Sequence, residues 1–207
     1  MAVIRRNLDA FVERGLTGRD EAGAAFARIT VSTRIEDAGG VDHVIEAVPA
    51  VRETQLEVFG KLDAVCASDV VLGSTSGQPI SLMTARMKHP ERAVAMHFIY
   101  PAQLIPIVEV CGGPQTAPQV VTWACDVLKA VGQSPALMNK EVAEFLLPDL
   151  DTSEAPPGAV AKLVKAGHFG LKSGRGVYDW STRDGKALLT ARAAKLFQHM
   201  AEDAKKP

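Results

Sequence analysis

The chain has 207 residues, of which 47% are hydrophobic and 23% charged, so it is long enough for one well-buried domain and a smaller second one. Its formal charge of −1, from 23 basic and 24 acidic side chains, argues against nucleic acid or a membrane surface as a partner. No apolar run approaches the roughly 20 residues that span a bilayer, and residues 1–7 do not resemble a signal peptide, so we expect a cytoplasmic protein.

The three cysteines, Cys66, Cys111 and Cys125, lack the spacing of metal ligands. Each lies in a stretch that is typical of a buried strand or helix. We therefore interpret them as reduced packing residues and predict no metal site.

The chain opens with helical patterns. Ile4, Leu8 and Phe11 recur at helical spacing, and Gly15 marks the end of that helix. A second short helix over 21–28 leads into an apolar segment, 29–32, which we interpret as a strand.

Strands and helices then alternate along the chain. Apolar runs predict strands at 41–48, 69–72, 93–98, 104–110 and 134–138. Helical patterns lie between them at 53–65, 80–86 and 116–131. Buried strands that alternate with helices favour a parallel sheet covered on both faces.

The composition changes after residue 145. Residues 1–145 form the predicted α/β domain, and 146–158 are rich in proline and aspartate, as is typical of a linker. Residues 159–207 carry two helical patterns, at 159–166 and 186–204, around a glycine-rich stretch. That stretch follows a helix and does not match G-x-G-x-x-G, so we interpret it as turns.

Polar side chains follow two of the predicted strands. Ser74-Thr75-Ser76-Gly77 comes directly after one of them, where an open α/β sheet presents loops to a ligand, although an ordinary turn would have the same composition. His97 ends the next strand, and Glu109 lies near the end of the following one. If these strands are neighbours, the carboxylate can orient the imidazole as a general base, or the two form a structural pair.

Several stretches in combination resemble one known family. They are Asp-His-Val-Ile-Glu-Ala-Val-Pro at 42–49, the serine loop at 74–77, Met-His-Phe-Ile-Tyr-Pro at 96–101 with Ile-Val-Glu-Val at 107–110, and Lys-Ser-Gly-Arg-Gly-Val-Tyr-Asp-Trp at 172–180. The chain is similar in these to the NAD-dependent 3-hydroxyacyl-CoA dehydrogenases, particularly the branch with short 3-hydroxy acid and carnitine dehydrogenases. The resemblance covers 1–145 and 147–180.

The resemblance implies oxidation of a 3-hydroxyl to a 3-ketone with NAD, on a 3-hydroxyacyl-CoA or a 3-hydroxy acid. It implies His97 as general base, Glu109 as its orienting partner and Ser76 as the hydroxyl that holds the substrate oxygen near the nicotinamide. The cofactor would lie beside Ser74, Ser76 and the strand end at Ala47 and Val48.

The sequence also departs from the family pattern. Family members begin with a strand, a glycine-rich loop and a helix, followed by a second strand, and these 207 residues contain none of them. The asparagine that follows position 145 in the family is absent too. We therefore expect an α/β fold with an incomplete Rossmann-type doubly wound sheet, lacking its first two strands, and a short remnant of the α-helical C-terminal domain.

Two functional hypotheses remain open. The first is a dehydrogenase that is active if another chain supplies the missing cofactor loop. The second is a non-catalytic remnant or pseudoenzyme that acts as an oligomerising or interaction module. Exposed sheet edges favour a homo-oligomer over a monomer in either case.

Overall fold

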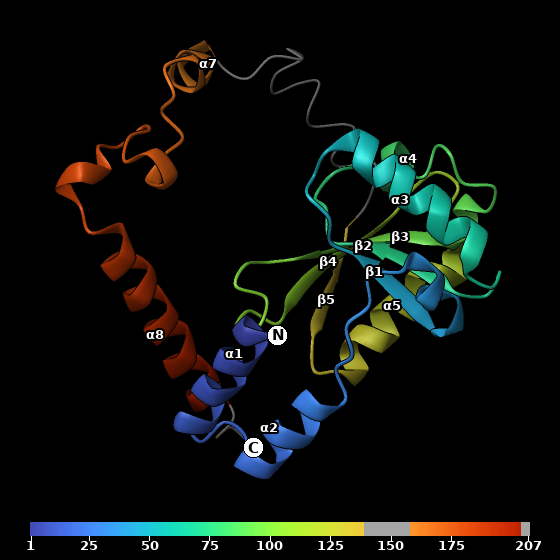
Figure 1. The fold of residues 1–207 in the computed structure, drawn as a ribbon, viewed down its shortest axis with the longest axis horizontal. Helices are drawn as coiled ribbons and strands as arrows, with labels where there is room; N and C mark the ends of the chain where they lie inside the picture. The colour runs from blue at the N-terminus through green and yellow to red at the C-terminus, as the bar shows by residue number, and fades with distance from the viewer. Residues whose placement is uncertain (139–157, 204–207) are drawn as a thin grey trace.

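The computed structural model describes residues 1–138 and 158–203, and its centre is a five-stranded sheet in the order β1-β2-β3-β4-β5 (Figure 1). The strands are β1 (His43–Glu46), β2 (Val71–Ser74), β3 (Ala93–Phe98), β4 (Ile107–Gly112) and β5 (Ser134–Leu137). The expected α/β class with a Rossmann-like sheet is confirmed. Among the described residues, β1 is an edge strand that pairs with β2 alone.

The expectation of a wholly parallel sheet is wrong at one place. Strands β1, β2 and β3 are parallel, as are β4 and β5, but β4 runs antiparallel to β3. The connection over 99–106 contains no helix. It is too short for the crossover of a dozen or more residues that a parallel pair needs, so the chain turns back directly.

Helices cover both faces of the sheet, as the alternation of elements predicts. Figure 1 shows α3 (Arg52–Val65) and α4 (Ile80–Met83) on one face and α5 (Pro118–Ala130) on the other. Two buried clusters result, one around Phe59, Leu72 and Met83 and one around Met96, Val110 and Leu128. Alternate residues of β3 enter the two clusters, which is the period-two pattern of a strand buried on both sides.

The first two predicted helices are confirmed as α1 (Ala2–Glu13) and α2 (Arg19–Ala27), and Gly15 between them has the positive φ of 67° that favours glycine. The predicted strand at 29–32 is wrong. This segment pairs with no described strand, and Val31 is 73% exposed. Apolar character alone therefore does not predict that a segment pairs into the sheet.

The C-terminal part contains α7 (Gly158–Lys165), the short turns η3 (Leu171–Ser173) and η4 (Trp180–Thr182), and the long helix α8 (Gly185–Asp203). Helix α8 lies beside α1 (Figure 1), where the rings of Phe11 and Phe197 meet edge to face with centroids 5.6 Å apart. The proposed linker lies outside the described residues, apart from Gly158 at the start of α7.

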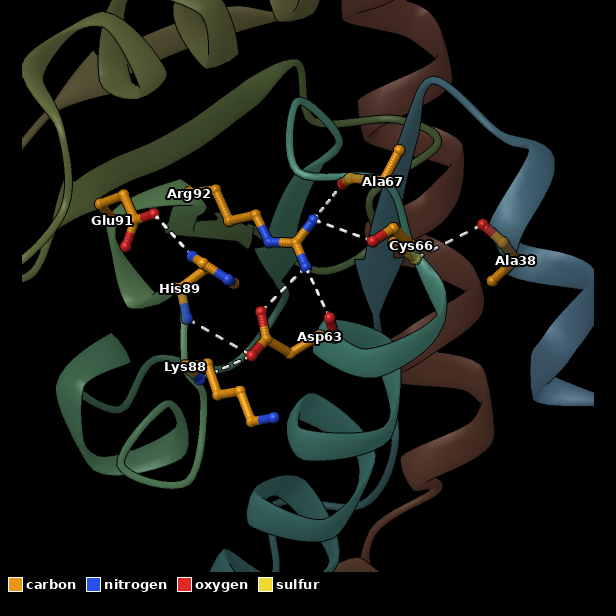
Figure 2. A network of polar contacts seen from close by, with 8 residues as sticks. All are labelled: Ala38, Asp63, Cys66, Ala67, Lys88, His89, Glu91 and Arg92. Atoms are coloured by element: carbon orange, nitrogen blue, oxygen red, sulfur yellow. Dashed lines mark hydrogen bonds and ion pairs between the residues drawn. The ribbon is translucent and has the colours of Figure 1, made fainter.

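A buried arginine closes the C-terminal end of α3 (Figure 2). Arg92, which ends the short helix η2 (Pro90–Arg92), donates to the backbone carbonyls of Asp63, Cys66 and Ala67 and to the Asp63 carboxylate at 2.8 Å. The other oxygen of that carboxylate accepts the backbone N–H groups of Lys88 and His89. The guanidinium thereby satisfies carbonyls that a helix end leaves without partners.

Gln55 on α3 carries a buried amide whose side chain has no hydrogen bond to the described part of the chain. The residue is fully buried, and neither side-chain amide atom has a partner among residues 1–138 and 158–203. An unsatisfied buried polar group costs about 1–3 kcal/mol, so Gln55→Met, which keeps the shape and removes the polar atoms, is expected to raise the free energy of unfolding by about that amount. Urea denaturation measures it.

The matched control for this substitution is Gln198→Met, because Gln198 is exposed on α8 and bonds Glu202. Its free energy of unfolding is expected to change by less than about 0.5 kcal/mol. A clear loss of stability in Gln55→Met would mean that the amide is hydrogen-bonded in solution.

Candidate active site

His97 and Glu109 face each other across two neighbouring strands. The antiparallel register of β3 and β4 places them directly opposite, with His97 Nδ1 2.7 Å from Glu109 Oε2. Each side chain is 38% exposed, so the pair is accessible from solvent. The expected convergence is confirmed, but Glu109 lies in the first half of β4, because β4 runs antiparallel to β3.

The contact with Glu109 selects one tautomer of the imidazole. An ionised carboxylate only accepts hydrogen bonds, so beside it the neutral imidazole carries its proton on Nδ1 and keeps its lone pair on Nε2. Nε2 points to the loop after β2, since a Cβ atom built on Gly77 would lie 3.5 Å from it. His97 therefore directs a basic nitrogen toward the serine loop.

Ser76 lies in the same loop, immediately before Gly77. Its side chain is partly buried, and its Oγ accepts a hydrogen bond from the backbone N–H of Gln78 at 3.2 Å. The hydroxyl donates to no acceptor among the described residues, so its proton can bond a ligand. The structure thus brings together three of the residues and segments expected at the site, His97, Glu109 and the loop that carries Ser76.

The expected cofactor residues lie at the ends of β1 and β2. Ala47 is exposed and Val48 partly buried, directly after β1. Ser74 is fully buried at the end of β2, and its hydroxyl donates to Glu46 Oε2 at 2.6 Å. Its side chain therefore points into the protein, and a contact of this position with a ligand would involve the backbone.

A cleft of about 310 Å³ lies between α1, the segment after β3 and α8. Its lining residues include the apolar Phe11, Leu104 and Phe197 and the basic Arg6 and Arg192. Arg192 also donates to the Tyr100 carbonyl at 2.8 Å, three residues beyond His97. None of the described lining residues is acidic, so the cleft suits an anion with an apolar part.

No metal site is built by the described residues, because no group of three or more His, Cys, Asp or Glu side chains comes together in them. Nor is any helix in the described ranges long and apolar enough to cross a membrane.

Comparison with known proteins identifies the family. Residues 1–142 match the model of the 3-hydroxyacyl-CoA dehydrogenase NAD-binding domain. With its Rossmann-like sheet and its His–Glu pair, the chain belongs to the 3-hydroxyacyl-CoA dehydrogenase family of oxidoreductases, whose cofactor is NAD.

Two curated relatives come from Mesorhizobium japonicum. The chain is 37% identical over 127 residues to 5-formyl-3-hydroxy-2-methylpyridine 4-carboxylate 5-dehydrogenase, covering 60% of this chain and 40% of the relative. It is 33% identical over 144 residues to an L-carnitine dehydrogenase, covering 69% of this chain and 38% of the relative. The chain thus matches well under half the length of either enzyme.

Solved structures agree on the fold. The 3-hydroxybutyryl-CoA dehydrogenase of Escherichia coli K12 superposes with a TM-score of 0.74 at 22% identity, over 88% of this chain and 52% of that one. A crystal structure of 5-formyl-3-hydroxy-2-methylpyridine 4-carboxylic acid 5-dehydrogenase gives 0.71 at 23% identity, over 96% and 89%. At this identity the likeness shows the fold alone.

Three residues of this region have no role that the sequence patterns predict. Glu46 is a buried carboxylate. The sequence feature that could have pointed to it is an acidic residue inside the apolar run at 41–48. Gly77 lies beside the His97 ring, and Arg192 bonds the carbonyl of Tyr100, 92 positions away in sequence. No local sequence pattern predicts a contact between residues so far apart in the chain.

Proposed function

We propose that the chain is the catalytic part of an NAD-dependent dehydrogenase that oxidises a 3-hydroxyl to a 3-ketone. The observation that carries the proposal is the 2.7 Å contact of His97 Nδ1 with Glu109 on an accessible rim, where Nε2 bonds no other residue in the described part of the chain. Nε2 takes the proton of the substrate hydroxyl while the Ser76 hydroxyl bonds the substrate oxygen. The Glu109 carboxylate stabilises the imidazolium that forms.

The residues at the ends of β1 and β2 fit the nicotinamide half of the cofactor. Ala47, Val48 and the backbone of the serine loop lie at the carboxyl ends of parallel strands, and Gly77 leaves the space beside His97 open. NAD bound there would accept the hydride from C3 of the substrate. The 207 residues contain no glycine-rich loop for the pyrophosphate of NAD. The backbone N–H groups that bind this pyrophosphate would therefore come from another segment or another chain.

The cleft beside Tyr100 supports a substrate with an acyl chain and an anionic end. Its apolar lining suits the chain, and Arg6 and Arg192 suit a carboxylate or a phosphate, although His97, Glu109 and Ser76 are not among its lining residues. A 3-hydroxyacyl-CoA and a short 3-hydroxy acid both meet this description. We propose a cytoplasmic location for this metabolic role.

A second candidate is a non-catalytic module that assembles with other subunits. Strand β1 favours it, because among the described residues this strand has a partner on one side only and Ile45 is 38% exposed. In that case the His97–Glu109 pair is inherited and does not turn over substrate. Cofactor affinity separates the two candidates.

Titration of the purified chain with NADH tests the proposed function. We expect a change in nicotinamide fluorescence and a rise in melting temperature as NADH is added, because a ligand that binds the folded state alone stabilises it. Oxidation of NADH with acetoacetyl-CoA, and with acetoacetate in parallel, then distinguishes the two substrate classes. No binding up to millimolar NADH by folded protein would favour the second candidate.

A further inference from the structure

Glu46 is a buried carboxylate at the site end of β1. Its residue is 4% exposed, and its two oxygens accept hydrogen bonds from the Val48 N–H and from the Ser74 hydroxyl, both at 2.6 Å. No cation among the described residues pairs with it. A buried charge held by two neutral donors is costly, and apolar replacements of buried ionic groups are often neutral or stabilising, so stability alone does not account for it.

The hydrogen bonds of Glu46 lead to the serine loop. Ser74 Oγ, which donates to the carboxylate, accepts the backbone N–H of Ser76 at 3.1 Å. The backbone N–H of Thr75 donates to the Glu46 carbonyl at 2.9 Å. The loop that carries the Ser76 hydroxyl is thus tied to β1 by two separate bonds, and one of them passes through a side chain.

The same carboxylate also holds the segment after β1. Val48 N–H reaches back to Glu46, so the strand ends of β1 and β2 are fixed to one group. Bonds to a charged acceptor are about twice as strong as neutral ones. A carboxylate at this point therefore sets the distance between the two loops that flank the site.

We infer that Glu46 is a positioning residue, which acts through Ser74 to place Ser76 for the reaction. This role rests on the proposed function, because it concerns how the Ser76 hydroxyl is held where it and His97 can reach the same substrate oxygen. Glu46 itself does not contact the substrate, because it is buried beneath the loop.

The test compares Ser74→Ala and Glu46→Gln with the control Glu53→Gln, whose side chain is 70% exposed in an ion pair with Arg86. Ser74→Ala removes the bridging oxygen, so the amide hydrogen exchange of Ser76 is expected to rise at least about tenfold, as loss of a bond in a charge-assisted chain implies. We expect kcat to fall by a similar factor with little change in KM. The control is expected to leave the exchange rate of the Ser76 amide, kcat and KM unchanged.

A double substitution separates positioning from a general effect on the fold. If Glu46 and Ser74 act through the Ser76 hydroxyl, Ser74→Ala lowers kcat in the wild-type background but not further in Ser76→Ala. An equal loss in both backgrounds would overturn the inference. Unchanged Ser76 exchange in both Ser74→Ala and Glu46→Gln would overturn it as well.

Different measurements test the dehydrogenase activity and the role of Glu46. If the wild type shows no turnover, the dehydrogenase proposal fails, and the exchange of the Ser76 and Val48 amides still decides whether Glu46 holds the loops. If Ser74→Ala does not fold, Glu46→Gln answers the question, since it keeps the shape, removes the charge and replaces one of the two acceptor oxygens with an NH2 donor.

Discussion

His97→Gln is expected to lower kcat by about 10²- to 10⁴-fold while leaving the affinity for NADH unchanged, because it removes the general base and little else. Glutamine occupies a similar volume and still presents a polar group to Glu109, but it takes no proton from a substrate hydroxyl. Oxidation of NADH with acetoacetyl-CoA measures the turnover, and nicotinamide fluorescence measures the affinity.

The matched control is His89→Gln. That imidazole is 54% exposed beside Glu91, and its side chain lies outside the proposed site. The control is expected to keep full turnover and full affinity. Retention of turnover by His97→Gln would remove His97 from the role of base.

The sequence predicts the sheet well where side chains are buried on both faces. The predicted strand at 93–98 has its observed bounds, because a short continuous apolar run between turn residues is typical of a strand buried on both sides. The segment at 29–32 is also partly apolar but pairs with no described strand, and only the folded chain reveals that difference. The direction of a strand also depends on which strand it pairs with, and local sequence does not determine this. The sequence therefore does not predict that β4 runs antiparallel to β3.

The His97–Glu109 pair is predicted from residue types at strand ends, and the resemblance supplies its role. The buried links are not predicted. Glu46 and Ser74 are 28 positions apart, and Asp63 and Arg92 are 29 apart, so their contacts exist only after the strands and helices have packed. A charged residue inside an apolar run is a usable signal that some such partner exists.

Arg92→Met is expected to lower the free energy of unfolding by about 3–5 kcal/mol, because it leaves the buried Asp63 carboxylate without its cation. Both side chains are 4% exposed, and the guanidinium also satisfies three carbonyls at the end of α3 (Figure 2). Methionine fills the volume but donates no hydrogen bond. Urea denaturation followed by circular dichroism measures the change.

The control for this substitution is Arg86→Met, which breaks the exposed ion pair of Arg86 with Glu53. An exposed pair contributes about 0–1 kcal/mol, so we expect a change within that range. If the two substitutions cost the same, the Arg92 network does not stabilise the end of α3 beyond an ordinary surface contact.

The stability of the network also depends on pH. Burial opposes the charge of Asp63, but hydrogen bonds from Arg92 and from the Lys88 and His89 backbone outweigh it and lower the pKa of the carboxyl. A carboxyl whose pKa is lower in the folded state stabilises the fold fully above its unfolded pKa of about 3.9, and this contribution is lost as the pH falls through the folded value.

Asp63→Asn removes this titration, because the amide carries no ionisable proton. Its cost in free energy of unfolding is therefore expected to be largest near neutral pH and to shrink as the pH falls below about 4. Urea denaturation of wild type and variant across that range measures the difference. A cost that stays constant with pH would mean that the carboxylate charge contributes nothing, and that Asp63 stabilises the end of α3 only as a neutral acceptor for Arg92 and the two amides.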